Sequence, residues 1–392
     1  MSNKDTADIM KTISAMRSGI KTVRELDTAL SDLKKTTKMS VSELRNFYLS
    51  ANDTAKQTGV TTQEIIKQAA AWSRLGFNTA DAATKLAKYS SMFAAISHGM
   101  NLDSATDGLA AVMQAFKIGL EDTDEVVDGI MSKINIIGKT QAIDNSDIVD
   151  FLTRSSDAMA EANNTLDETI ALGTAMVEIT RDAAGAGQAL NAVSMRVRGY
   201  DEETKEYIGG VEELSGKIAD LTKTASTPEG ISLFSDKTKT EYKSTRQLLQ
   251  DISEIYNQLT NENKTALLET LAGKGNGQAV AAVLNNFDTV TQSLESMSNS
   301  AGNAEAEMAV AMDSLDYKLN KVKETGTGIA QNLFGNEDIK SIIDILNSFM
   351  GVLDNVTEKF GLLGTIGLGA GLFAGLKNVG RDKMYSLICY LF

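Results

Sequence analysis

The chain of 392 residues carries a formal net charge of −14 and no cluster of Lys and Arg, which argues against a specific nucleic-acid partner. Its one cysteine, Cys389, excludes an intrachain disulfide and a cysteine-based metal site. It has a single proline, Pro228, and only 6% aromatic residues, and because proline breaks helix interiors this composition predicts an all-α fold.

Residues 1–37 lack the apolar core of a secretory signal and predict an N-terminal coiled-coil helix. Apolar residues recur at steps of three and four, with one step of seven, at Ile9, Ile13, Met16, Ile20, Val23, Leu30 and Leu33. Sustained spacing of this kind is typical of a coiled coil. A single amphipathic helix on a globular core would give the same pattern, and both interpretations stay open.

Residues 38–303 predict a packed multi-helix bundle, because short helical runs are separated by glycines and capping residues. The capping-box pattern occurs at Thr61 with Glu64 and at Thr165 with Glu168, and Gly76 is a predicted helix stop. Further helix starts are predicted at Thr79, Ser146 and Asn261. One stretch does not fit a helix: the β-forming residues near 231–242 predict a small β-hairpin.

Residues 304–359 predict long coiled-coil or rod helices. A first apolar seam comprises Met308, Met312, Leu315, Leu319, Val322, Ile329 and Leu333. A second seam follows at Ile339, Ile342, Leu346, Phe349, Leu353, Val356 and Phe360. Heptad-patterned helices are therefore expected at both ends of the bundle.

Residues 360–392 form an apolar, glycine-rich C-terminal segment. Its first seventeen residues, 360–376, carry no charge, and Gly367, Gly371 and Gly375 share one side of a helix. A membrane span needs about 20 apolar residues, so this run is at the short limit. It is interpreted either as a membrane-active segment or as a buried helix that packs against identical copies.

Two glycine clusters invite comparison with phosphate-binding loops. Gly185 and Gly187 follow a stretch with helical rather than strand periodicity, so they are interpreted as the turn between two helices. Gly273, Gly275 and Gly277 also follow a helical run, and their spacing is not that of a phosphate loop. The second cluster is likewise interpreted as a turn.

Few residues offer catalytic chemistry. His98 is the only histidine, so a Ser–His–Asp triad or histidine-based zinc site cannot be assembled, and we expect it at a helix C-terminus. Glu202–Glu203 and Glu212–Glu213 are interpreted as solvated faces, and Trp72 as a core residue. The sequence predicts no catalytic, cofactor-binding or metal-binding residues, no cofactor, no small-molecule substrate and no enzymatic activity.

Three segments, in order, resemble the core of the phage tail tape-measure family, which includes minor tail proteins. They are TAMVEITRDAAGAGQALNAVSMRVRG (174–199), LLQDISEIYNQLTNENKTALLETLAGKGNGQAVAAVLNNF (248–287) and SAGNAEAEMAVAMDSLDYKLNKVK (300–323). The capped helices at 55–78 are also similar to the family, and the resemblance covers roughly residues 20–375. Family members are usually longer, so the chain is expected to be a truncated or fragmentary member, such as a prophage product.

The resemblance implies a structural protein that acts as scaffold and length ruler for tail-tube assembly. It implies parallel self-association, with a trimer as the expected state, and contacts with tail-tube, initiator or baseplate proteins and assembly chaperones. The expected location is the lumen of the tail tube in the virion, the host cytoplasm during assembly, and the host membrane during DNA ejection. The alternative from the apolar run and the heptads is a helical membrane-active protein of pore-forming type.

Overall fold

The computed structural model describes residues 25–324, apart from 27, 38, 78, 120–122, 202–204, 208–209, 315–316, 319 and 322–323. Contacts group Thr36–Thr325 into one compact unit, and Met1–Lys35 with Gly326–Phe392 into another. The described part of 25–35 is helical and buries Leu26, Ala29 and Leu33, whereas Leu30 is only half-buried. The remaining predicted N-terminal seam, the C-terminal seams beyond residue 324 and the apolar run 360–376 lie outside the described residues.

The described residues are largely helical, which confirms the all-α prediction. The first helices of the compact unit are α2 (Val41–Thr58), α3 (Thr62–Arg74), α4 (Ala80–Ile96), α5 (Leu102–Ala115), α6 (Thr123–Thr140), α7 (Asn145–Glu161), α8 (Leu166–Thr180) and α9 (Ala183–Arg196). They are followed by α10 (Val211–Leu221), α11 (Thr245–Tyr256), α12 (Asn261–Ala272), α13 (Gly277–Asn285), α14 (Phe287–Ser298) and α15 (Asn303–Met312).

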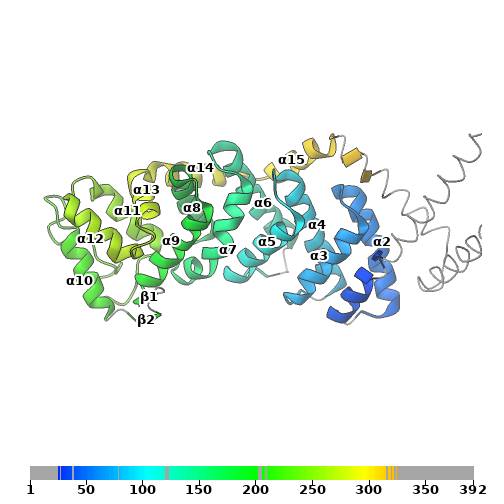
Figure 1. Cartoon of the computed structure of the whole chain (residues 1–392), viewed down its shortest axis with the longest axis horizontal. Helices are drawn as coiled ribbons and strands as arrows, with labels where there is room; N and C mark the ends of the chain where they lie inside the picture. The colour runs from blue at the N-terminus through cyan, green and yellow to red at the C-terminus, as the bar shows by residue number, and fades with distance from the viewer. Residues whose placement is uncertain are drawn as a thin grey trace, which may run out of the picture. The chain divides into compact units, whose positions relative to one another are not determined.

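Helices α2 to α9 form a stack of two layers (Figure 1). The odd-numbered helices pack in the order α3, α5, α7 and α9, and the even-numbered helices in the order α2, α4, α6 and α8. Each helix also contacts a sequence neighbour in the other layer, as α3 does with α4 and α7 with α8. The stack therefore advances along the chain by antiparallel helix pairs.

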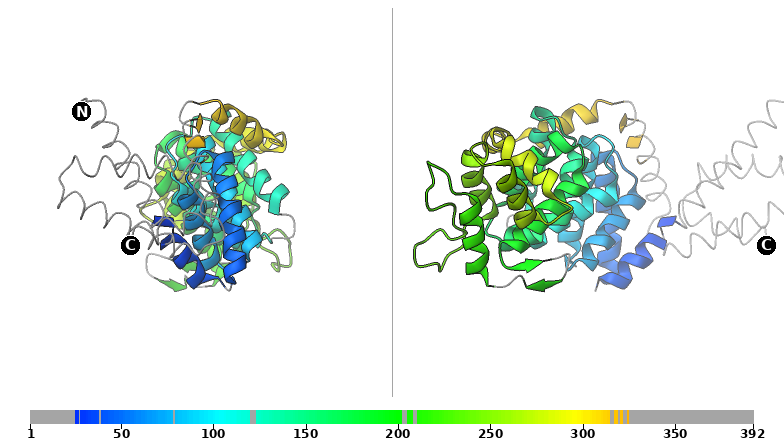
Figure 2. Two further views of the ribbon diagram at one scale, coloured as in Figure 1. Left: turned by 90° about the vertical axis from the view of Figure 1, so that its right-hand side faces the viewer. Right: turned by 60° about the vertical axis from the view of Figure 1, so that its left-hand side comes forward.

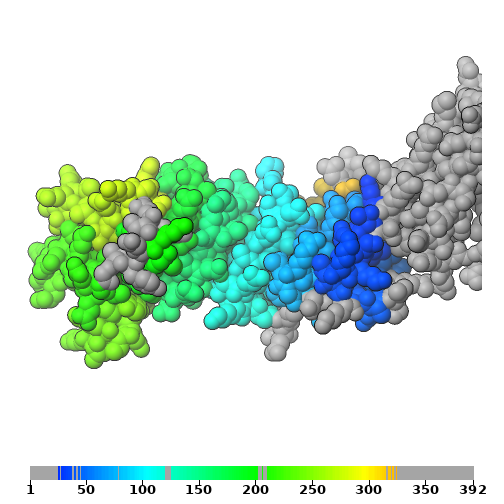
Figure 3. Space-filling model, turned by 60° about the horizontal axis from the view of Figure 1, so that its bottom comes forward, coloured from blue at the N-terminus to red at the C-terminus, as the bar shows by residue number. Residues whose placement is uncertain are grey.

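After α12 the chain turns back along the even-numbered layer. Helix α13 packs on α8, α14 on α8 and α6, and α15 on α6 and α4. Figure 2 shows this return path from two further directions. In Figure 3, in which the bottom of the Figure 1 view comes forward, the colour of the stack changes from blue to green along the molecule, and little of the orange segment is visible.

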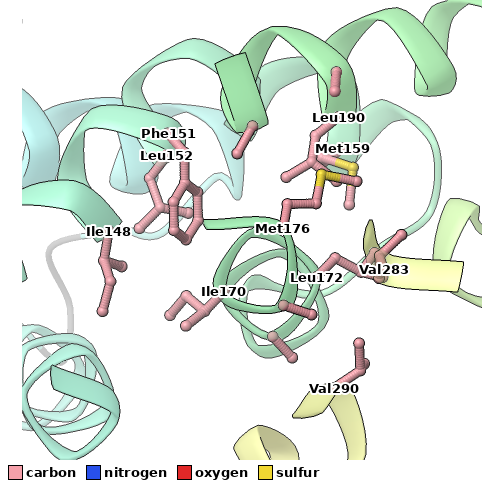
Figure 4. Packing of buried hydrophobic residues seen from close by; sticks show 14 of the residues in the cluster. Ile148, Phe151, Leu152, Met159, Ile170, Leu172, Met176, Leu190, Val283 and Val290 are labelled. Atoms are coloured by element: carbon pink, nitrogen blue, oxygen red, sulfur yellow. The ribbon is translucent and has the colours of Figure 1, made fainter. Parts of the chain in front are cut away.

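Helix α8 is the centre of the core. All nine residues from Thr169 to Val177 are buried, so this helix is enclosed on every side. Figure 4 shows Ile170, Leu172 and Met176 of α8 surrounded by side chains from other helices. These neighbours include Phe151 and Leu152 of α7, Leu190 of α9, Val283 of α13 and Val290 of α14.

The interpretation of Gly185 and Gly187 as a turn is wrong in position. The chain bends earlier, at Arg181, which has a φ of 56°, and Asp182 caps α9 by accepting a hydrogen bond from the Gly185 amide at 2.9 Å. Both glycines lie inside α9. Gly187 is needed for packing instead, because a Cβ there would lie 2.9 Å from the Phe151 Cα and carbonyl oxygen of α7.

Most of the predicted helix ends are confirmed. Thr61 and Thr165 form complete capping boxes, Thr79 caps α4, and α12 begins at Asn261. The start predicted at Ser146 is wrong, because α7 begins at Asn145 and Asp144 is its N-cap residue. The side chain of Asn145 instead donates to Ser97 Oγ at 3.0 Å, so a long-range contact overrides the local signal.

The β-structure of the described residues is small. An isolated antiparallel bridge joins Phe234 to Tyr242 in the stretch where the sequence predicts a hairpin, and the two rings stack 5.1 Å apart. A second antiparallel pair, β1 (Tyr200–Asp201) with β2 (Glu206–Tyr207), was not expected from the sequence.

Gly187→Ala is expected to destabilise the compact unit by about 1–3 kcal/mol, because overpacking at the α7–α9 contact must push backbone away from backbone. Gly129→Ala is the matched control: Gly129 is also helical, its Cβ would meet nothing within 4 Å, and alanine favours helix. Urea denaturation followed by circular dichroism measures both. A midpoint for Gly187→Ala at or above that of the unchanged protein would contradict the packing role of this glycine.

Candidate functional site

The residues considered for chemistry do not converge in the structure. His98 is exposed just after the C-terminal end of α4, as expected, and Trp72 is fully buried with its Nε1 donating to Ser90 Oγ at 3.0 Å. Glu212 and Glu213 are exposed in the first turn of α10. Gly273 and Gly275 lie in the turn between α12 and α13, as predicted, whereas Gly277 is the first residue of α13.

The described residues contain neither a cluster that could hold a metal ion nor a helix that could span a membrane. Over the parts of 25–324 that the structure describes, His, Cys, Asp and Glu side chains nowhere gather in threes or more in a way that would hold a metal ion. Over the same parts, every helix is too short or too polar to cross a bilayer.

The feature that stands out is the segment lying over the even-numbered layer. We call residues 303–324, as far as they are described, the return strap: it comprises α15 and the described residues that follow it. Its contacts join residues more than 160 positions apart in the sequence, as between Asn303 and Asn135. The face that it covers is therefore the best candidate for a surface with a function.

The first end of the return strap is anchored to α6. Asn135 Nδ2 donates to Asn303 Oδ1 at 2.5 Å, and the Ala304 amide donates to Ser132 Oγ at 3.0 Å. Lys139 forms an ion pair with Glu307. These bonds include the backbone amide of Ala304, which lies in the first turn of α15 where helical partners are lacking.

The other end of the return strap is anchored at the corner between α2 and α3. Tyr317 Oη donates to the carbonyl oxygens of Lys56 and Gln57 at 2.9 and 2.8 Å. Asn320 Nδ2 donates to the Gly59 carbonyl oxygen at 2.9 Å. These are carbonyls at the C-terminal end of α2, which have no partner within their own helix.

Glu324 binds the other helix of this corner, at the N-terminus of α3. Its side chain is buried, with the residue only 3% exposed, and its Oε2 accepts from the Thr62 amide at 3.0 Å and from Thr62 Oγ at 2.6 Å. Thr62 is the first residue of α3, so the carboxylate lies at a helix N-terminus, where negative charge is favoured. The return strap thus supplies partners to the ends of two helices at once.

Apolar contacts contribute less to the attachment of α15. Ala304 and Met308 are buried, but Val310 is 66% exposed and Met312 38% exposed. The helix ends at Met312, so the predicted seam through Met308 and Met312 is not buried along one continuous helix in this region. A shallow depression beside it is lined by Ala309, Val310, Asp313 and Ser314.

One electrostatic contact disfavours the attachment of the return strap to α6. Burial, and then repulsion from Glu305 of α15, raises the pKa of Asp128 on α6 above its ordinary value, while a hydrogen bond with Ser132 acts in the other direction. A raised carboxyl pKa means that the folded protein holds this proton more tightly than the unfolded chain does. The contribution of Asp128 to stability is therefore least favourable when the group is ionised.

The sequence contains a weak signal for these anchors. Tyr317, Asn320 and Glu324 follow each other at steps of three and four, which places them on one helical face. Heptad analysis selects the apolar residues of this region and passes over the polar ones. Their partners lie about 260 residues away and cannot be identified from local pattern.

Glu324→Ala is expected to loosen the return strap by about 1–3 kcal/mol, because the buried amide and hydroxyl of Thr62 lose their acceptor. Hydrogen exchange at the Thr62 amide and in α15 measures this. Glu324→Gln keeps an acceptor oxygen and should retain part of the protection. Glu305→Ala, an exposed carboxylate in the same strap, is the control and should show no loss. Unchanged exchange in Glu324→Ala would contradict the anchoring role.

Asp128→Asn is expected to raise the urea midpoint at neutral pH, since it removes the half-buried like charge facing Glu305. The advantage should disappear as the pH falls through the raised pKa of Asp128, where the protonated carboxyl resembles the amide. Asp107→Asn, on the exposed side of α5, is the control and should leave the urea midpoint unchanged at neutral and at acid pH. A gain that persists unchanged at acid pH would refute this electrostatic account.

Comparison with known proteins places this fold in a family. A family model described as phage-related minor tail protein matches residues 49–273, more than half of the chain. The match begins within α2 and ends just after α12, so it includes the two-layer stack and stops before the return strap. No solved structure matches the chain. By this match, the chain belongs to the phage-related minor tail protein family.

Proposed function

We propose that this chain is a tape-measure protein, a scaffold and length ruler around which tail-tube subunits assemble. Membership of the minor tail protein family makes it a phage tail protein, and that match is the observation that carries the proposal. The all-α fold supports it, because a helix converts residues into length at about 1.5 Å per residue.

The compact unit itself is poorly suited to measuring length. Its chain runs outward through α2 to α12 and then returns over the even-numbered layer through α13 to α15. Residues inserted in a surface turn of such a unit add bulk but no reach. We therefore assign the measuring role to those parts of the heptad-patterned segments 1–37 and 304–359 that lie outside the compact unit, and propose that the compact unit serves as a docking module.

The proposed surroundings of the chain are the tail tube, its assembly partners and the host membrane. Several parallel copies, a trimer in our proposal, would lie in the lumen of the tail tube and contact initiator or baseplate proteins and assembly chaperones. The uncharged run 360–376 would meet the host membrane when the chain leaves the tube ahead of DNA. In this role the chain is structural rather than enzymatic.

Tandem duplication of residues 325–359, which preserves the heptad register, is expected to lengthen the phage tail by about 53 Å. Electron microscopy of tails from a phage whose tail contains the chain measures this. The control is an insertion of 35 Gly and Ser residues at Gly275, in an exposed turn where an added Cβ would meet nothing within 4 Å, and it should leave tail length unchanged. Tails of unaltered length in the duplication would reject the ruler.

A further inference from the structure

We propose that the face of the even-numbered helices is a docking surface for the return strap of a second copy of this chain, so that two copies exchange straps. In the closed form each strap covers the face of its own stack. In the exchanged form the same contacts form between copies with two-fold symmetry, in a dimer of the free chain that is separate from the trimer proposed for the tail tube. This inference concerns self-association alone and does not depend on the chain acting as a ruler.

The contacts of the return strap are compatible with exchange. Every anchor pairs a strap residue with a residue of the stack, as Glu307 with Lys139, Tyr317 with Lys56 and Glu324 with Thr62. None of these bonds requires both partners to belong to one chain. A second copy therefore presents the same donors, acceptors and charges to the same face.

The link that holds a strap to its own stack is short and bent. Helix α14 ends at Ser298 and α15 begins at Asn303, and the bend includes Gly302 with a φ of 73°. Residues other than glycine rarely adopt this backbone conformation. When residues 299–302 take helical angles instead, α15 continues the direction of α14 and the strap leaves the face of its own copy.

The strap itself contributes few apolar side chains to the contact. In the described part of the strap the buried apolar side chains are Ala304, Met308 and Tyr317, whereas Val310 and Met312 are exposed already. Asp128 and Glu305 repel each other in the closed form. Exchange then restores each hydrogen bond that opening breaks, so concentration decides between closed and exchanged forms.

The test uses the unaltered full-length chain in light and ¹⁵N-labelled forms. Equal amounts are mixed as folded protein and, in parallel, unfolded in urea and refolded together at several concentrations, with recovery of helix checked by circular dichroism. Monomer and dimer are separated by size. A carbodiimide then joins Lys139 to Glu307 across their ion pair, and mass spectrometry reads the isotopes of the two linked peptides.

Exchange predicts that about half of the Lys139–Glu307 links in the dimer join light to heavy peptide, and that links in the monomer never do. The ion pair of Lys133 with Asp167, at 2.7 Å between α6 and α8, is the control in the same sample. It lies outside the strap, so its links must stay within one copy. A dimer whose Lys139–Glu307 links are all unmixed, or no dimer at the highest concentration, would overturn the proposal.

A pair of glycine variants tests the bend. Gly302→Ala places a side chain at a positive φ with no atom within 4 Å of its Cβ, so its effect acts through the backbone alone. The exchanged fraction should rise about five-fold or more. Gly99→Ala, at a φ of 73° and equally open, imposes the same strain outside the strap and should leave that fraction unchanged. Equal fractions in the two variants would show that the bend does not govern exchange.

Discussion

The structure depends on the burial of the middle of α8, from Thr169 to Val177. A helix with buried side chains from Thr169 to Val177 needs neighbours on every side, and the two-layer stack alone supplies α7 and α9. The uncovered side is closed by α13 and α14, which come from later in the chain. Gly173 allows this helix to approach the ring of Phe151, where a Cβ would overlap it. The return of the chain over the even-numbered layer follows from this demand for cover.

Along the return path the chemistry of attachment changes. Helix α14 buries Val290 and Met297, whereas the return strap is attached largely through hydrogen bonds and one ion pair. Hydrogen bonds of this kind contribute modestly to net stability but determine register, because each unmatched buried group is costly. The hydrogen bonds thus fix the position of the strap on the stack but contribute little net free energy to its attachment. A segment with these properties is suited to move between partners while the core around α8 stays intact.

Structural features with a local cause could be predicted from the sequence. The capping boxes at Thr61 and Thr165 depend on residues three positions apart, and both are present. Prediction failed where distant residues decide. Gly187 lies inside α9, where the backbone of Phe151 leaves no room for a Cβ, and α7 begins one residue before Ser146, at Asn145, whose side chain bonds to Ser97. The candidate surface was missed for the same reason. Glu324 gains its role only when Thr62, the first residue of α3 and some 260 residues earlier, presents its amide and hydroxyl as donors.

The position of the return strap also bears on how the compact unit connects to the heptad-patterned run that follows it in the sequence. The strap's last described residue, Glu324, adjoins the heptad-patterned run that continues to Phe360 in the sequence. Glu324 bonds to Thr62 near the beginning of the stack, so the chain leaves the compact unit close to where its helices begin. Tension on the following segment would act first on this corner and on α15, which bury few apolar groups, and only later on α14 and α8. The order of attachment therefore sets an order of release, with the core protected to the end.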